Sequence, residues 1–401
     1  SPQICIFSRI VRTLPLRGLQ DPIYCLSMSL DFTLEKSVFQ SVEIPDEPRN
    51  RIFTGMRVLS VLCVLFLIHH GASGLELVHT IRGNIAPKSV GYSACGLIFA
   101  QNMMYRHSIT VYDRQFRLVK TIPDVVELSK FGYAKYKGFY RGSPVEVTFT
   151  DSGKSAWVSN YFMSGRGFVN PGNDSCSDGR NRDFSFVYQI DTKALAVVGV
   201  APAGSVPKYL AGTPDSRYVL VSNWCSGDVS VIDAARDKEI RRIRVGRFPR
   251  GIVVDSASST AYIAVMGSYD IAVLHLKDFS LTYLRGVGRS PRHLVIDPRG
   301  AFLYATLNGE GRVAKVDLFG GRPVQRVNTG QAPRSMTISS DGKYLYVTNY
   351  FSDTVSKVRT ADMHVEQEVK TEHHPIGITY DPVSKRVWVA CYTGSIMVFQ
   401  D

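Results

Sequence analysis

The chain has 401 residues and a net charge of +12, and 44% of its residues are hydrophobic, which is enough for a large core without metal or disulfide staples. Its seven cysteines are too few for a small disulfide-rich scaffold. The excess of basic side chains favours partners that carry negative charge, such as an anionic small molecule, a polysaccharide or an acidic protein surface.

The first 74 residues are interpreted as segments outside the folded domain. A short apolar run over residues 58–68 follows Met56-Arg57 and precedes Ala72-Ser73-Gly74. Secretory signal peptides typically have a basic start, a short apolar stretch and an end of small residues. The apolar stretch here is too short to span a bilayer. A signal anchor with a short cytoplasmic segment is the alternative. We therefore predict an unstructured, mis-assigned extension over 1–55, a signal peptide over 56–74, and a periplasmic or secreted mature chain over 75–401.

Internal repeats organise the rest of the chain. Five prolines, from Pro207 to Pro375, recur every 42 residues. Pro144 continues this series upstream if the interval before Pro207 contains an insertion of 21 residues, and Pro87 continues it if the next interval contains an insertion of 15 residues. Each repeat holds four short segments rich in Val, Ile, Thr and Tyr and bounded by Gly, Asp, Asn and Ser. This period predicts an all-β fold, a seven-bladed β-propeller of four-stranded antiparallel blades. The repeats begin near Pro87, Pro144, Pro207, Pro249, Pro291, Pro333 and Pro375.

The seventh repeat lacks a fourth strand, because it reaches Asp401 after only three strand-like segments. Residues 75–83 offer the missing strand, and their part 78–83 resembles residues 324–330 of the fifth repeat. We expect this mature N-terminal strand to complete the last blade, since that pairing removes both open sheet edges.

Tyr346-Val347-Thr348-Asn349 recurs in weaker form as Val221-Ser222-Asn223 and Val158-Ser159-Asn160. On these residues, the region 75–401 resembles the YVTN β-propeller repeat family, which includes YncE-like exported proteins and propeller modules of surface-layer proteins. The resemblance implies the fold and leaves the function open. We expect the asparagines to stabilise turns rather than to bind a ligand. Four blades depart from the motif, with Met103, Val265, Leu307 and Cys391 where the asparagine would stand.

The clearest functional signal is a set of basic residues beside the repeated prolines. In five blades, the residue after the proline is basic, and it begins the strand expected to line the central channel. In two linkers, an arginine stands two residues before the proline. Such a ring would focus a field on anions, and arginine can bind a carboxylate or phosphate with two hydrogen bonds. The predicted ligand-binding residues are Lys88, Lys208, Arg250, Arg292 and Arg334, together with Arg247 and Arg289.

Two insertions are expected to open on the same face as this ring. The first, about 125–141, mixes basic and aromatic residues, and we expect Tyr133, Tyr136, Tyr140 and Arg141 to contact the ligand. This pattern also suits single-stranded nucleic acid, which an exported protein seldom meets. The second insertion, about 164–184, contains Cys176. We expect Cys176 to form a disulfide with Cys225 in the corresponding loop of the next blade.

These patterns predict a non-catalytic binding protein, monomeric, with no transmembrane helix in the mature chain, no cofactor and no metal. The loop around Asp174 only faintly resembles a calcium loop. Four histidines expected near the basic face, His107, His293, His373 and His374, lack the spacing of a metal site. A lactonase for an acidic sugar lactone, with His293 or Glu146 as the base, is the enzymatic alternative suggested by propellers similar to this repeat. A surface-layer or envelope module is a third.

Overall fold

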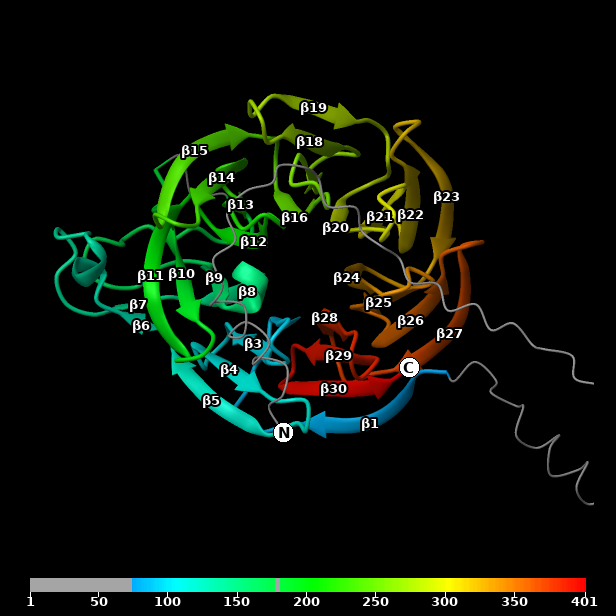
Figure 1. Cartoon of the computed structure of the whole chain (residues 1–401), viewed down its shortest axis with the longest axis horizontal. Coiled ribbons are helices and arrows are strands. Elements are labelled where there is room, and N and C mark those ends of the chain that lie inside the picture. The colour runs from blue at the N-terminus through cyan, green and yellow to red at the C-terminus, as the bar shows by residue number, and fades with distance from the viewer. Residues whose placement is uncertain (1–73, 177–180) are drawn as a thin grey trace, which may run out of the picture. The chain divides into compact units, whose positions relative to one another are not determined.

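The computed structural model describes residues 74–176 and 181–401, which form an all-β ring of seven four-stranded antiparallel sheets (Figure 1). The predicted seven-bladed propeller is confirmed. The expected extension over 1–55 and the signal peptide over 56–74 lie outside the described residues, apart from Gly74. Among residues 74–176 and 181–401, no helix has the length and hydrophobicity needed to cross a lipid bilayer.

Blades one to three follow one another along the chain. Blade one consists of β2 (Ser89–Tyr92), β3 (Ile98–Asn102), β4 (Ser108–Tyr112) and β5 (Leu118–Pro123). Blade two consists of β8 (Pro144–Thr150), β9 (Ser155–Asn160), β10 (Ser185–Asp191) and β11 (Ala196–Ala203). Blade three consists of β12 (Pro207–Gly212), β13 (Tyr218–Asn223), β14 (Asp228–Asp233) and β15 (Lys238–Arg244).

Blades four to six repeat this order. Blade four consists of β16 (Pro249–Val254), β17 (Thr260–Val265), β18 (Ile271–His275) and β19 (Leu281–Leu284). Blade five consists of β20 (Pro291–Ile296), β21 (Phe302–Leu307), β22 (Arg312–Asp317) and β23 (Arg322–Asn328). Blade six consists of β24 (Pro333–Ile338), β25 (Tyr344–Asn349), β26 (Thr354–Arg359) and β27 (His364–Lys370).

The seventh sheet joins the two ends of the described chain. It contains β28 (Pro375–Asp381), β29 (Arg386–Cys391), β30 (Ser395–Gln400) and β1 (Glu76–Ile81). Strand β1 pairs antiparallel with β30, with Ile81 opposite Ile396. Leu75 is buried, and its backbone N–H donates to the side chain of Gln367 in blade six at 2.6 Å. That residue 75 is the first residue of the mature chain stays a prediction.

Burial changes in a regular way from the channel to the rim. Middle strands such as β13 are buried on both sides because neighbouring blades cover both faces of the sheet. The outermost strand of the same blade, β15, is largely exposed and carries Lys and Arg. Between blades, the apolar faces pack together: Trp157 of blade two lies in one cluster with Leu210 and Val219 of blade three. This wedge packing holds the ring together without a central core.

The signature asparagines have a structural role, as expected. The Asn349 side-chain amide donates to Thr354 at 3.1 Å and to Ser356 at 2.9 Å, which ties the second strand to the third. In blade one, Asn102 takes this position instead of the predicted Met103. Tyr92 pairs with Ile98 there, whereas Ile338 pairs with Leu345 in blade six, so the first turn of blade one is shorter.

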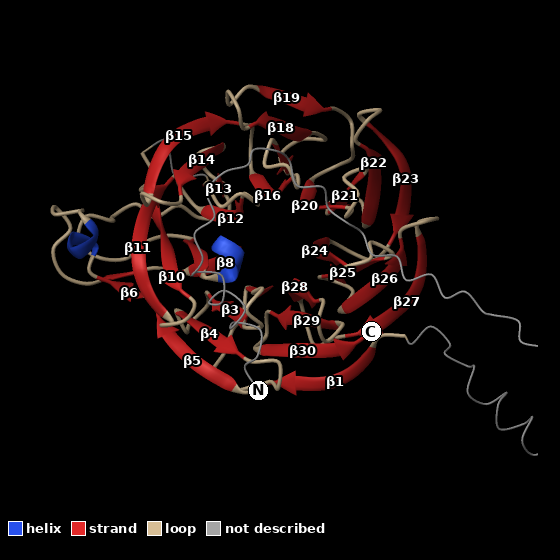
Figure 2. Ribbon diagram, viewed as in Figure 1, coloured by secondary structure: helices blue, strands red, loops and turns tan. Residues whose placement is uncertain are grey.

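The first insertion forms a small subdomain at the rim. It contains β6 (Val125–Val126), which pairs with β7 (Tyr140–Arg141), and the 3-10 helix η1 (Leu128–Phe131). The helix packs against β11, the outermost strand of blade two, and it lies outside the ring in Figure 2. A second short 3-10 helix, η2 (Asp151–Gly153), joins β8 to β9.

Candidate functional site

Five basic side chains meet at one mouth of the central channel: Lys88, Lys208, Arg250, Arg292 and Arg334. We call this set the mouth cluster. Four of them follow the proline that begins an innermost strand, and Lys88 lies one residue before β2, so the repeat places the five at equivalent positions around the channel. Figure 1 shows the innermost strands around the centre of the ring. Burial lowers the pKa of Lys88 well below its usual value, and the four other cations lower it further. The five charges are therefore close enough to repel one another.

Neighbouring blades hold the arginines in place. The Arg250 guanidinium donates to the backbone carbonyl of Lys208, one blade back. The Arg292 guanidinium donates to the carbonyl of Arg334, one blade forward, at 2.5 Å. Arg250 is 6% exposed and Arg292 is 5% exposed, so both charges are largely removed from water. Desolvated cations without enough counter-charge are costly, and an anion that binds beside them would relieve this cost.

Aromatic rings surround the mouth cluster. The ammonium of Lys88 lies 5.0 Å from the ring centre of Tyr392, and that of Lys208 lies 4.4 Å from Tyr161. The Arg334 guanidinium lies 3.6 Å from the ring of Tyr350. These rings stabilise the positive charges without neutralising them.

These aromatic residues share a repeat position that is not among the predicted ligand-binding positions. They directly follow the signature asparagine or the residue that replaces it. In four blades this position is aromatic, as Tyr161, Trp224, Tyr350 and Tyr392.

Two carboxylates approach the mouth cluster. Asp174, in the second insertion, pairs with Lys208 and accepts a hydrogen bond from the Tyr161 hydroxyl at 2.7 Å. The positive charge of Lys208 holds the pKa of Asp174 below its usual value. Glu146, on β8, is half-buried in the channel wall, and desolvation raises its pKa to about 7 although Arg250 opposes this shift. Within the described part of the chain, three arginines and two lysines of lowered pKa thus face one ionised carboxylate and one that is partly ionised near neutral pH.

A disulfide between Cys176 and Cys225 fixes the second insertion at the mouth. It joins the blade-two loop to the loop between β13 and β14, with the two Cα atoms 5.4 Å apart. The indole N–H of Trp224 donates to the backbone carbonyl of Asp174 at 2.9 Å. The position of Asp174 therefore depends on a loop connection and not on the repeat.

The channel beneath the mouth cluster contains a cavity of about 270 Å³, with lining residues from all seven blades. Glu146, Tyr209 and His293 lie on its wall. The Tyr209 hydroxyl lies 3.3 Å from His293 Nε2. Burial, followed by repulsion from Arg292 and Arg250, lowers the pKa of His293 to about 3, so its imidazole is neutral at pH 7. The Tyr209 hydroxyl, and not Glu146, is the hydrogen-bond partner of His293, and a base role for either residue stays a prediction.

A second cavity, of about 480 Å³, opens at the mouth between blades one and two. Its wall includes Lys88, Lys208 and Tyr161 from the ring, together with Met103 and His107. His107 Nδ1 lies 3.0 Å from the backbone carbonyl of Gly142. Among the described residues Nε2 of this ring has no hydrogen-bond partner.

The structure does not bring every predicted residue to the mouth. Tyr136 and Tyr140 are 7% and 2% exposed and pack with Phe168 and Phe186 in a rim cluster, joined by the half-buried Tyr133. Burial therefore removes Tyr136 and Tyr140 from any surface on which a ligand could stack. Arg141 is exposed beside them.

Three other predicted features lie on the loops around the mouth. The exposed Arg289 donates to the carbonyl of Gly309, and Arg247 lies over Phe248. His373 and His374 are engaged with Asp353 and Tyr350, respectively. Among the described residues, no cluster of three His, Cys, Asp or Glu side chains is arranged to hold a metal ion.

Comparison with protein-family models gives a match to part of the chain. A family model described as the cytochrome D1 heme domain matches residues 290–393, which run from β20 through β29. This similarity supports a β-propeller and covers only part of the chain. No protein with a curated description is significantly similar to the chain.

The matched stretch does not itself offer a haem site. It contains His293, whose Nε2 faces Tyr209 in the smaller cavity, and the adjacent pair His373 and His374, which already have other partners. The 480 Å³ cavity fits better, because His107 could bind iron through Nε2 while Nδ1 faces a carbonyl. Lys88 and Lys208 on the same wall could pair with the carboxylates of the macrocycle.

Proposed function

We propose that this chain is an exported YVTN-type propeller that binds an anionic small molecule at the mouth cluster without transforming it. The observation that carries the proposal is the concentration of five buried or half-buried basic side chains against two carboxylates, one of which has a pKa of about 7. A ligand with two or more carboxylate or phosphate groups could contact several blades at once. Arginine from adjacent blades would supply paired hydrogen bonds to such groups.

Two features support the exported part of this proposal. The repeat signature resembles that of exported propellers, and the Cys176–Cys225 disulfide suits an oxidising compartment. An anion-binding role fits the rigidity of the ring, because the cations are held in place before a ligand arrives.

Thermal unfolding in the presence of oxalate, citrate or pyrophosphate tests the proposal. A ligand present at 100 times its Kd stabilises the folded state by about 2.7 kcal/mol, so the melting temperature should rise by several degrees at low salt. The rise should shrink as sodium chloride screens the charges. The absence of any shift at low salt, or an equal shift with a neutral polyol, would contradict anion binding.

Haem is a second candidate ligand, favoured by the family match and by the position of His107. Haem would supply an iron centre for electron transfer or ligand binding, held by His107 with its carboxylates near Lys88 and Lys208. Titration with hemin, followed by its visible absorption band, tests this. The His107→Ala variant should abolish the spectral change, whereas the His364→Ala variant, on the outermost strand of blade six, should retain it. An unchanged titration in His107→Ala would exclude this site.

A further inference from the structure

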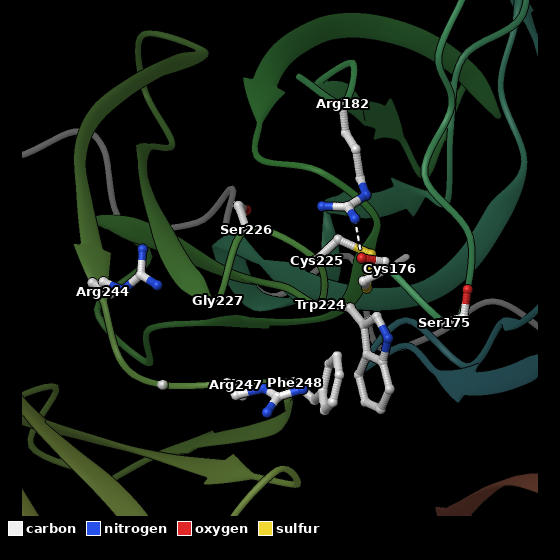
Figure 3. Close-up of a pocket in the computed structure, with 11 residues that line it drawn as sticks. Ser175, Cys176, Arg182, Trp224, Cys225, Ser226, Gly227, Arg244, Arg247 and Phe248 are labelled. Atoms are coloured by element: carbon white, nitrogen blue, oxygen red, sulfur yellow. Dashed lines mark hydrogen bonds between the residues drawn. A yellow bond between two sulfur atoms is a disulfide. The ribbon is translucent and has the colours of Figure 1, made fainter. Parts of the chain in front are cut away.

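A separate cavity lies on the mouth-side loops between blades three and four. It has a volume of about 640 Å³, and none of its lining residues belongs to the mouth cluster. Its wall is built from three chain segments: the blade-two insertion, the β13–β14 loop and the linker from β15 to β16. Figure 3 shows the arginines approaching the cavity from different sides.

The charged side chains that line this cavity are all positive. Arg182, Arg244 and Arg247 line it, and no carboxylate does so among residues 74–176 and 181–401. Neither Arg244 nor Arg247 forms an ion pair within the described part of the chain. The Arg182 guanidinium donates to the carbonyl of Cys176, and its buried Nε has no hydrogen-bond partner among the residues that the structure describes. Three guanidinium groups therefore face a cavity to whose wall residues 74–176 and 181–401 contribute no carboxylate.

The cavity also has an aromatic wall. Trp224 and Phe248 stack there with ring centres 4.7 Å apart and planes inclined by 24°. The Trp224 ring is half-buried, so part of its surface is open. Lys208 lies 5.4 Å from the ring centre of Trp224 and Arg247 lies 5.1 Å from that of Phe248, so a ligand ring would contact the exposed edges of this stack. An anionic group attached to that ring would reach the arginines.

We infer that this cavity binds an anionic group carried on an aromatic ring, such as an aromatic phosphate or carboxylate. None of the cavity's lining residues is a member of the mouth cluster, so this inference does not rest on the proposed function, although Lys208 of that cluster lies 5.4 Å from the Trp224 ring. The disulfide Cys176–Cys225 forms part of the wall, so its reduction should also weaken binding here.

Trp224 provides a direct readout, since Trp157 and Trp388 are fully buried. Phenyl phosphate should change the tryptophan emission and bind roughly tenfold more tightly than inorganic phosphate because of the added ring contact. Phenol, which has the ring without the anion, should cause little change.

Calorimetry with variants locates the site. Arg244→Gln combined with Arg247→Gln should weaken phenyl phosphate at least tenfold. Phe248→Ala should weaken phenyl phosphate but leave inorganic phosphate unchanged. Arg236→Gln, an exposed arginine at the opposite end of β14, is the matched control and should bind as the wild type does.

A mouth-cluster variant separates the two sites. Lys88→Gln combined with Arg334→Gln should retain binding of phenyl phosphate and the emission change. The inference would be overturned if the Arg244→Gln and Arg247→Gln pair bound normally, or if the mouth-cluster variant abolished binding.

Discussion

Asp174 of the blade-two insertion forms an ion pair with Lys208 of blade three, so a loop places a carboxylate among cations that the repeat supplies. The lysine side chain is 7% exposed, whereas the Asp174 side chain is 75% exposed. The pair thus lies at the boundary between the channel and solvent. A ligand anion that reaches Lys208 must compete with this internal carboxylate.

Removal of that competitor should strengthen binding. We expect Asp174→Asn to bind oxalate about fivefold more tightly, the effect of one partly screened charge. Calorimetry at low salt measures this, and thermal unfolding checks that the variant is folded. The control is Asp151→Asn, because Asp151 is an exposed aspartate on the turn that follows β8, at the end of this strand away from the mouth cluster. This variant should not change the affinity for oxalate. Weaker oxalate binding in Asp174→Asn would show that the carboxylate assists the ligand instead.

Oxalate binding should depend on pH between 6 and 8. Burial raises the pKa of Glu146 to about 7 and lowers the pKa of Lys208 to about 7. As the pH rises through 7, Glu146 gains negative charge and Lys208 loses positive charge. His293 stays neutral and Tyr209 stays protonated in this window, because burial lowers the pKa of the first and raises that of the second.

Both changes act in the same direction, so affinity for oxalate should fall about tenfold from pH 6 to pH 8. Oxalate is suitable because it remains a dianion over this range. The Glu146→Gln variant should bind more tightly than the wild type at pH 8 and show a shallower pH profile. A profile that rises with pH would contradict these assignments.

The pairing of β1 with β30 should contribute to stability. Ile81 is 8% exposed and packs in a cluster with Ile396, Val398 and Trp388. We expect Ile81→Ala to lower the free energy of unfolding by about 2–4 kcal/mol through loss of buried contacts and the cavity left behind. Leu77→Ala, on the same strand but 51% exposed, is the control and should cost less than about 1 kcal/mol. Urea denaturation compares the two, and equal midpoints would contradict a structural role for β1.

The ring architecture could be predicted because each sequence repeat corresponds to one four-stranded blade. The prolines mark where each innermost strand begins, and the segment between them must form a sheet whose two faces are covered by neighbours. The same periodicity placed Lys208, Arg250 and Arg292 around one opening, since equivalent positions in successive blades lie at equal height. The aromatic position after Asn349 and Asn223 carries a comparable signal, and the same comparison between blades would have found it.

Features that depend on the insertions could not be predicted in the same way. Tyr136 and Tyr140 resemble ligand-stacking residues by composition, but their partners Phe168 and Phe186 lie far along the chain. Likewise, the path that brings Asp174 to Lys208 depends on the Cys176–Cys225 link, and loop paths are not set by the repeat. The unequal pKa values of Glu146 and His293 arise from burial among several blades.

Oxalate titration of a mouth-cluster variant tests the central claim most directly. Lys88 and Arg334 are the half-buried members of the cluster, so Lys88→Gln combined with Arg334→Gln should leave the fold intact. The control is Lys343→Gln, an exposed lysine on the turn between β24 and β25, at the opposite end of the channel. Calorimetry at low salt should show at least tenfold weaker oxalate binding in the double variant and wild-type binding in the control. Equal affinity in all three proteins would contradict anion binding at the channel mouth.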